Sequence, residues 1–362
     1  MAILSAKAKP ISKGKAAVVV AAIAVIAVFP LVFTNPAVTE IAIFALMFMA
    51  TSEAWNGFAG WSGYFSLGHA VFFGVGAYTF AIIANDYKLP AGSGLFLLMP
   101  VAGVVAMVAA VLVGAVALRT KRHTFVVITI GVFFIFQLLG YNLSITAGAS
   151  GLQVPTPYNW NAATFNNPFY YAAAILLGFT VGLYWIIRRS AFGLQLLAIR
   201  DDEERAKGLG VPVWRVKLSA FVISSFPVGM AGALFAFLIG QIYPNTVFNP
   251  LFDLSWALMT LVGGIGTIAG PLLGGVVLES VQQYLNLYLS NADIYLIVYG
   301  VVFLAVMFWM PRGVVPTVGD ALRRRRGAGE ATIAATNNGG TGSSSEGKAT
   351  GSLAGVVQEG GK

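Results

Sequence analysis

The chain has 362 residues, of which 57% are hydrophobic and only 10% are charged. A soluble domain carries roughly 25% charged residues, so this composition excludes an ordinary soluble protein and indicates a membrane protein. The net charge is +8, but no basic face is interleaved with aromatic residues that could stack on bases, which argues against nucleic-acid binding. The absence of cysteine excludes disulfides, thiolate nucleophiles and thiolate metal ligands.

Apolar stretches alternate with short polar connections from Ala16 to Met310. A helix needs about 20 apolar residues to cross the hydrocarbon core of a membrane. We therefore predict an all-α, polytopic membrane protein with eight to ten transmembrane helices. The predicted spans lie near residues 16–33, 37–55, 63–84, 95–117, 124–143, 169–187, 217–239, 251–267, 270–289 and 294–310.

Lys and Arg are concentrated in every second connection between the predicted spans, which places them on one side of the membrane. These connections hold 21 of the 22 basic residues, and the loops of opposite parity contain only Lys88. Cytoplasmic loops are enriched in Lys and Arg because anionic lipid and the insertion machinery hold cations on that side. We therefore predict a multi-pass protein of the cytoplasmic membrane with a cytoplasmic N-terminus over 1–15. A transmembrane domain is expected over 16–318, and a cytoplasmic tail over 319–362.

Two stretches depart from the pattern of apolar spans. GGIGTIAGP (263–271) is a Gly/Pro break that predicts either a cytoplasmic turn or the tip of a re-entrant hairpin. Both alternatives leave the C-terminus inside, so charge does not distinguish them. The tail from 319 onward is rich in Gly, Ser and Thr and has few apolar anchors, so we expect it to be disordered.

Few residues could carry enzymatic chemistry. The chain has no GxxxxGK[ST] phosphate loop, and its two histidines lack metal-ligand spacing, so we predict no enzyme activity, no cofactor and no metal site. Acidic residues within spans usually face the protein interior or a water-filled cavity, whereas Glu40 and Asp253, near span ends, are interpreted as interfacial. The predicted translocation pathway comprises Glu53, Ser66, His69 and Glu279, and the alternative for His69 is a hydrogen bond between helices.

The longest basic connection, residues 188–217, contains the sequence DDEERAKGLGVP. Asp201 is predicted to cap a short helix, with Glu204 in the capping-box position, and the Gly and Pro residues that follow should end it. Acidic residues suit the N-terminus of such a helix and basic residues its C-terminus. The helix is either an inert surface feature or a docking element for a cytoplasmic motor. The candidate docking residues are Asp201, Asp202, Glu203, Glu204, Arg205, Ala206, Leu209 and Gly210.

Five blocks of the sequence resemble the permease subunits of branched-chain amino-acid ABC transporters, of the LivM type. GWSGYFSLGHAVFFGVGAYT (60–79) is similar to the block GxxGxxSLGHxxFFGxGAYT of that family, and TAGASGL (146–152) to its TxGxxGL loop. SAFGLQLLAIRDDEERAKGLG and the residues after it (190–236) resemble the family's coupling segment. LVGGIGTIAGPLLGG (261–275) and MPRG (310–313) resemble its GGxGTxxGP and PxG segments.

The resemblance implies half of a transmembrane channel that imports a hydrophobic amino acid. It also implies a second homologous permease, two cytoplasmic ATP-binding subunits and a periplasmic solute-binding protein as partners, in contact with membrane lipid. Nucleotide-driven closure of the ATPases would pull on the segment 201–210 and switch access to the pore. The alternatives are a permease for urea or short amides and, from another class, an ion-coupled secondary transporter. A membrane scaffold would not need the capped helix.

Overall fold

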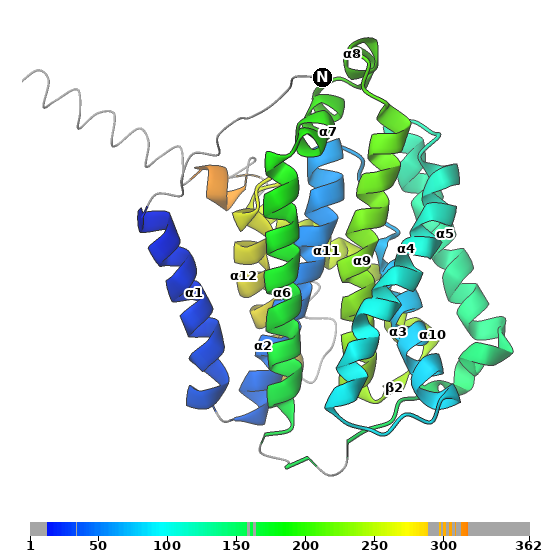
Figure 1. The fold of residues 1–362 in the computed structure, drawn as a ribbon, viewed down its shortest axis with the longest axis vertical. Coiled ribbons are helices and arrows are strands. Elements are labelled where there is room, and N and C mark those ends of the chain that lie inside the picture. The colour runs from blue at the N-terminus through cyan, green and yellow to red at the C-terminus, as the bar shows by residue number, and fades with distance from the viewer. Residues whose placement is uncertain are drawn as a thin grey trace, which may run out of the picture. The chain divides into compact units, whose positions relative to one another are not determined.

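The computed structural model describes residues 13–33, 35–157, 160–161, 164–288 and 313–317, with scattered positions between 297 and 308. Figure 1 shows this part of the chain as a bundle of helices. The chain divides into a compact unit, Met1–Pro316, and a second unit, Thr317–Lys362, of which only Thr317 is described. The predicted tail lies outside the described residues, and most of the predicted N-terminal segment and of the tenth span does so too.

The described chain is an all-α membrane protein, as predicted. The helices are α1 (Lys13–Val32), α2 (Pro36–Trp55), α3 (His69–Asp86), α4 (Leu98–Ala117), α5 (Arg122–Asn142), α6 (Asn166–Arg189), α7 (Ala191–Asp201), α8 (Glu203–Gly208), α9 (Val213–Ile239), α10 (Pro244–Val247), α11 (Pro250–Gly263) and α12 (Ala269–Tyr288). Short π and 3-10 helices are η1 (Asn56–Gly60), η2 (Ser93–Leu97), η3 (Ser144–Thr146) and η4 (Gly148–Ser150). Two short strands, β1 (Leu152–Gln153) and β2 (Gln241–Ile242), pair antiparallel.

Five of the described helical stretches are long and apolar enough to cross a membrane: Pro36–Gly60, Ser93–Ala117, Arg122–Asn142, Asn166–Arg189 and Val213–Ile239. The basic connections gather at one end of the bundle. In Figure 1 this end carries α7 and α8 at the top, whereas β2 and α10 lie at the bottom. The α4–α5 connection shares a cavity with α8 and therefore lies at the same end. We call this the basic end.

Close helix packing around α9 depends on small residues. A Cβ atom added to Gly76 of α3 would overlap the carbonyl group of Gly229 in α9, and one added to Gly232 would overlap that of Phe73. Gly229 also lies against Ala106 of α4. Backbones in a membrane approach this closely only through small residues, so these glycines serve helix packing.

The third predicted span, 63–84, is wrong at its start, because α3 begins only at His69. The preceding segment 61–68 is not helical beyond its first two residues, although most of it is buried. Side chains supply the missing hydrogen bonds: Thr129 Oγ1 accepts from the Leu67 backbone N–H at 3.2 Å, and Trp55 Nε1 donates to the Ser66 carbonyl at 2.8 Å. Irregular backbone at membrane depth is tolerated where the protein satisfies it in this way.

The break GGIGTIAGP forms a turn at the basic end. Asn56, in η1, accepts from the Gly266 backbone N–H at 2.8 Å and donates to the Thr267 carbonyl at 2.9 Å. The helix that leads to this turn, α11, has 14 residues and is about 21 Å long, which is too short to cross the membrane alone. The predicted span 251–267 is therefore a part-length helix, and α12 runs back from the turn.

Candidate functional site

The α7–α8 corner is capped by Asp202, one residue after the predicted cap. Asp202 Oδ1 accepts from the Arg205 backbone N–H at 3.0 Å, and Asp202 Oδ2 lies 3.7 Å from Arg205 Nε. Asp201 is instead the exposed last residue of α7, so the prediction that it caps the helix is wrong. Aspartate is a favourable N-cap residue at either position. Asp202 takes the role because its backbone is extended, as an N-cap residue requires.

The two apolar docking candidates of this segment face opposite ways. Ala206 is 2% exposed and packs inside the chain. Leu209 is 79% exposed. Glu204 and Gly210 are also exposed, and Gly210 has a φ of +84°, which makes the chain turn sharply into Pro212. The exposed apolar side chain at the end of α8 is therefore that of Leu209, the C-cap residue, rather than that of Ala206.

Glu203 fastens α8 to the transmembrane bundle. Glu203 Oε1 accepts a hydrogen bond from Lys217 Nζ of α9 at 2.7 Å, and Glu203 Oε2 accepts one from the Tyr64 hydroxyl at 2.6 Å. Lys217 Nζ also donates to the Tyr64 hydroxyl oxygen at 2.8 Å. We call these three residues the basic-end cluster. Since Tyr64 belongs to the segment 61–68, the cluster joins α8 directly to the irregular part of the bundle.

The charge of Glu203 is stabilised by this contact. Partial burial opposes ionisation of the carboxyl group, but the hydrogen bonds from Lys217 and Tyr64 outweigh it and lower the pKa of Glu203 below its usual value.

Two arginines add further hydrogen bonds between the basic end and the rest of the bundle. Arg122 Nη2 donates to the Ile199 and Arg200 carbonyls at 2.8 Å each, and Arg200 Nη1 donates to the Gly60 carbonyl at 2.7 Å.

A second polar group lies deeper in the same segment. His69 Nδ1 is 2.9 Å from Ser66 Oγ, and His69 Nε2 is 2.9 Å from Ser224 Oγ of α9. Ser224 donates its own hydroxyl hydrogen to the Phe221 carbonyl at 2.8 Å, so Nε2 is assigned as the ring donor and Nδ1 as the acceptor from Ser66. We call these residues, Ser66, His69 and Ser224, the interior cluster. All three are fully buried.

Asp253 meets the start of α3. Both of its carboxylate oxygens lie 3.2 Å from the Ala70 backbone N–H, and the residue is 1% exposed. The interpretation of Asp253 as an interfacial residue is therefore wrong. A carboxylate at a helix N-terminus is stabilised by unpaired N–H groups and by the helix dipole. Asp253 also lies in the first turn of α11, so it ties two helix starts together.

The predicted pathway carboxylates, Glu53 and Glu279, are fully buried on α2 and α12. Asn56 Nδ2 lies 3.5 Å from Glu53 Oε2, and Gln283 Nε2 donates to Glu279 Oε1 at 2.8 Å. Within the described part of the chain, Glu53 Oε1 and Glu279 Oε2 have no hydrogen-bond partner. The structure thus brings Ser66 and His69 together but shows no hydrogen bond from either to Glu53 or Glu279 among the described residues.

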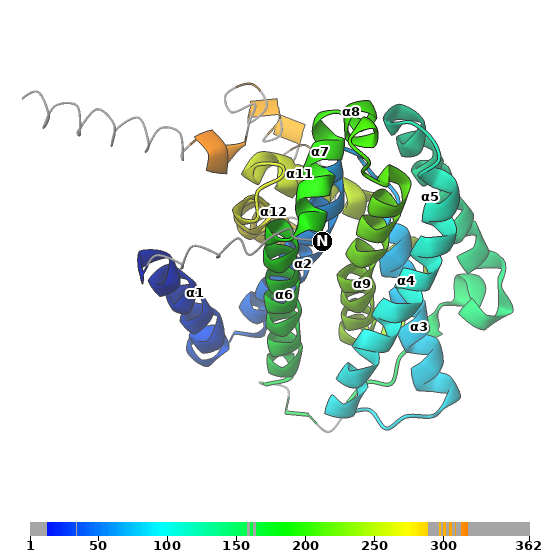
Figure 2. The same cartoon turned by 45° about the horizontal axis from the view of Figure 1, so that its top comes forward.

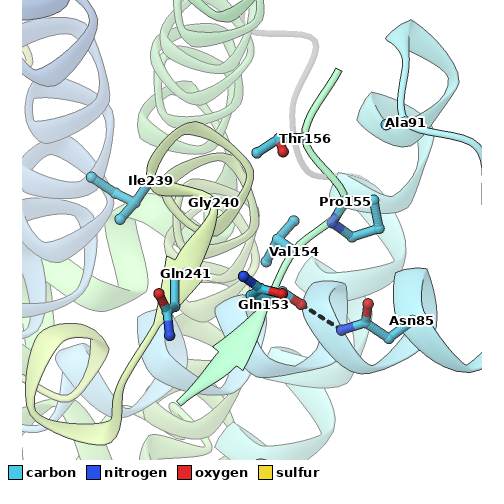
Figure 3. Close-up of a pocket in the computed structure, with 9 residues that line it drawn as sticks. All are labelled: Asn85, Ala91, Gln153, Val154, Pro155, Thr156, Ile239, Gly240 and Gln241. Atoms are coloured by element: carbon cyan, nitrogen blue, oxygen red, sulfur yellow. Dashed lines mark hydrogen bonds between the residues drawn. The ribbon is translucent and has the colours of Figure 1, made fainter. Parts of the chain in front are cut away.

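A cavity of about 530 Å³ lies at the end opposite α8, between β1 and the C-terminal end of α9 (Figure 3). Its polar side chains are uncharged, including Asn85, Gln153 and Gln241. Asn85 Nδ2 donates to the Gln153 carbonyl, the bond drawn in Figure 3. This end therefore offers neutral hydrogen-bonding groups, in contrast to the basic end.

Sequence reasoning missed Tyr64, Lys217 and Ser224 as site residues. Lys217 carried a signal, because it opens the predicted span 217–239, and a lysine at the start of a membrane helix needs a partner or a route to water. Tyr64 and Ser224 carried none, since their partners lie 139 to 155 positions away in the chain.

Together, the apolar bundle and its buried irregular segment define an integral membrane protein. The chain matches the family described as "Branched-chain amino acid transport system / permease component" over residues 37–307, and it belongs to that family. Its relatives in this family are ABC-type membrane permeases, which are transporters rather than enzymes.

The chain is 29% identical, over 80% of its length and 72% of the relative's, to the high-affinity branched-chain amino acid transport system permease protein LivM of Escherichia coli (strain K12). It is 28% identical to the L-arabinose ABC transporter permease protein AraH of Azospirillum brasilense, over 57% of the chain and 62% of that protein. It is also 28% identical to the fructose import permease protein FrcC of Rhizobium meliloti, over 45% of the chain and 48% of that protein. No solved structure matches the chain.

Proposed function

We propose that the chain is the membrane subunit of an ABC importer that moves branched-chain and other hydrophobic amino acids across the cytoplasmic membrane. It works with a second homologous permease, two cytoplasmic ATP-binding subunits and a periplasmic solute-binding protein. The basic end faces the cytoplasm, because Lys and Arg collect on that side of a membrane. ATP binding and hydrolysis belong to the separate subunits.

One observation carries the coupling role: Leu209, the C-cap residue of α8, is exposed, while Glu203 of α8 is bonded to Tyr64 and Lys217. A partner that seats Leu209 in a cleft moves α8. The basic-end cluster passes that movement to the segment 61–68, which starts at the end of η1 and leads into α3. The change between inward and outward access is then a shift between packed states, driven by the nucleotide state of the partner.

A hydrophobic amino acid is proposed as the substrate because the sequence similarity to the LivM relative covers more of the chain than the similarity to the sugar permeases. The LivM relative aligns with 80% of this chain, against 57% for the arabinose permease and 45% for the fructose permease. Uptake of labelled leucine by cells that contain the complete transporter should be inhibited by valine and isoleucine. Inhibition by arabinose, fructose or urea instead would contradict this assignment, and uptake that persists without the ATP-binding subunits would favour a secondary transporter.

Glu53 and Glu279 are the stronger candidates for the translocation pathway, because each keeps one carboxylate oxygen without a partner among the described residues. Ser66 and His69 already satisfy one another and Ser224. Glu53→Gln keeps the size of the side chain and removes its charge. If Glu53 contacts the route of the substrate, this variant assembles normally and transports more slowly. Normal uptake by Glu53→Gln would remove it from the pathway.

The coupling role is tested by Leu209→Asp in a tagged chain that is expressed with its ATP-binding subunits. A carboxylate placed in an apolar cleft must be desolvated, which costs several kcal/mol, so retention of the ATPase should fall more than roughly tenfold and uptake with it. Leu97→Asp is the matched control, because Leu97 is 78% exposed and lies in η2, at the other end of α4 from the basic α4–α5 connection. Equal ATPase retention by both variants would show that Leu209 does not dock a motor.

A further inference from the structure

A cavity of about 910 Å³ opens at the basic end, between the α4–α5 connection and the corner where α8 leads into α9. Figure 2, with the top turned forward, shows α8 beside the start of α5. One wall of the cavity carries Arg119 and Lys121 from the connection, and the other carries Lys207 of α8 and Arg215 of α9. The proposed coupling role of α8 does not use these four cations.

The cavity holds more positive charge than the chain neutralises. Among the described residues, Lys217 pairs with Glu203 and Arg205 pairs with Asp202, and no carboxylate pairs with the four cations of the cavity walls. Glu204 is the only other carboxylate in the lining. Arg122 also lines the cavity and donates to backbone carbonyls, which leave its charge unneutralised. Apart from the Lys217–Glu203 pair, five cations against one carboxylate leave a net excess of four positive charges, which attracts an anion.

The surface below the cavity is apolar. Only 28% of the most apolar stretch of α4 and 22% of that of α5 is buried within the chain, against 67% in α2 and α9. Val116 lies one turn before Arg119, and Val127 lies one turn and a half after Lys121, and both are largely exposed. Trp214, which is 40% exposed, also lines the cavity, and tryptophan is enriched at the level of lipid headgroups.

We propose that this cavity binds the headgroup of an anionic phospholipid from the cytoplasmic leaflet. The phosphate lies among Arg119, Lys121, Lys207 and Arg215, and the acyl chains lie along the exposed faces of α4 and α5. A basic pocket between transmembrane helices on the cytoplasmic side suits such a ligand. A free phosphate or an acidic protein segment would match the charge of the cavity but would leave the adjoining apolar faces uncovered.

The test is native mass spectrometry of the purified full-length chain, titrated with phosphatidylglycerol or with phosphatidylcholine. We expect phosphatidylglycerol to bind, and Arg119→Gln/Lys121→Gln to weaken that binding roughly 25-fold, at about fivefold for each charge lost near a membrane surface. Lys207→Gln/Arg215→Gln, on the opposite wall, should act similarly. Phosphatidylcholine should bind weakly to every variant. All four side chains are exposed, so the substitutions leave the folded core intact.

The matched control is Arg188→Gln/Arg189→Gln, which removes two exposed charges from the basic end of α6 without touching the cavity. Weakening by this control as large as that by the cavity variants would overturn the proposal, because it would show nonspecific attraction. Competition by inorganic phosphate at the concentration at which the lipid binds would also overturn it. Unchanged lipid binding in the cavity variants, with loss of ATPase retention, would assign the cavity to a protein partner instead.

Discussion

The basic-end cluster and the interior cluster sit two residues apart on the segment 61–68, but they are built differently. The first contains two opposite charges, and its Glu203 side chain remains 30% exposed, so water can replace a broken contact. The second is a chain of hydrogen bonds between fully buried groups, where a lost partner is not replaced by water. The comparison shows a segment with one adjustable end, at α8, and one fixed end, at α3.

A substitution at the fixed end, in the interior cluster, should cause the largest loss of stability. His69→Ala removes a buried ring and leaves the Ser66 hydroxyl without its acceptor, so we expect a loss of about 2–4 kcal/mol in the free energy of unfolding. Thermal unfolding of the purified chain in detergent measures the loss. His123→Ala, at an exposed position, is the control and should change stability by less than about 0.5 kcal/mol. A stable His69→Ala chain that fails to transport would instead place His69 in the pathway.

A substitution at the adjustable end, in the basic-end cluster, should cause a smaller loss of stability, and a second substitution should partly restore it. Glu203→Ala leaves the Lys217 ammonium group, whose side chain is 4% exposed, without a carboxylate, at a cost of about 2–3 kcal/mol. Adding Lys217→Met removes the stranded charge and should recover at least half of that loss. A double-mutant cycle in the same unfolding assay measures the coupling. Additive losses would show that the two side chains do not interact.

A substitution in the turn after α8 should cause a still smaller loss of stability. Gly210 has a φ of +84°, so Gly210→Val forces a β-branched residue into the left-handed region at a cost of about 1–2 kcal/mol. Nothing lies within 4 Å of an added Cβ atom, so the cost comes from the backbone alone. Gly208→Ala, in the helical part of the segment, is the control and should be neutral or slightly stabilising. Equal effects of the two variants would argue against a strained turn.

Acid should loosen the adjustable end and leave the interior cluster unchanged. The pKa of Glu203 is lowered in the folded chain, so its contact contributes fully above the usual carboxyl value near 4.5 and is lost as pH falls through the lowered pKa. Hydrogen exchange of the α8 amides, corrected for intrinsic pH dependence, should therefore be constant near neutrality and increase in acid. Glu203→Gln should remove the dependence. An unchanged pH profile in Glu203→Gln would show that another group is responsible.

Much of the fold could be predicted from the sequence, because hydropathy and loop charge are local signals. The spans 37–55, 95–117 and 217–239 agree with α2, α4 and α9 to within a few residues at each end. The start of α3 could not be predicted. Hydropathy treats 63–84 as one apolar run, whereas Thr129 and Trp55 supply hydrogen bonds that let its first residues stay irregular.

The candidate site was predictable where its residues are neighbours in sequence. A capped helix followed by Gly and Pro was evident in DDEERAKGLGVP, although two adjacent aspartates left the cap one residue out of place. The burial of Asp253 was not predictable, because its hydrogen-bond partner, the Ala70 backbone N–H, lies 183 positions away in the chain. The basic-end cluster joins three separate elements, so no spacing pattern in the sequence could indicate it.

Coupling depends on the transmission of movement from α8 to the segment 61–68, and Tyr64→Phe tests this most directly. The substitution removes a single hydroxyl group that donates to Glu203 and accepts from Lys217, and it leaves the ion pair between those residues and the surface around Leu209 in place. Uptake and substrate-stimulated ATP hydrolysis are measured in the assembled transporter, together with retention of the ATP-binding subunits. We predict normal retention with a loss of about fivefold or more in stimulated hydrolysis and uptake, the lower end of typical coupling free energies. Wild-type hydrolysis and uptake in Tyr64→Phe would contradict the account.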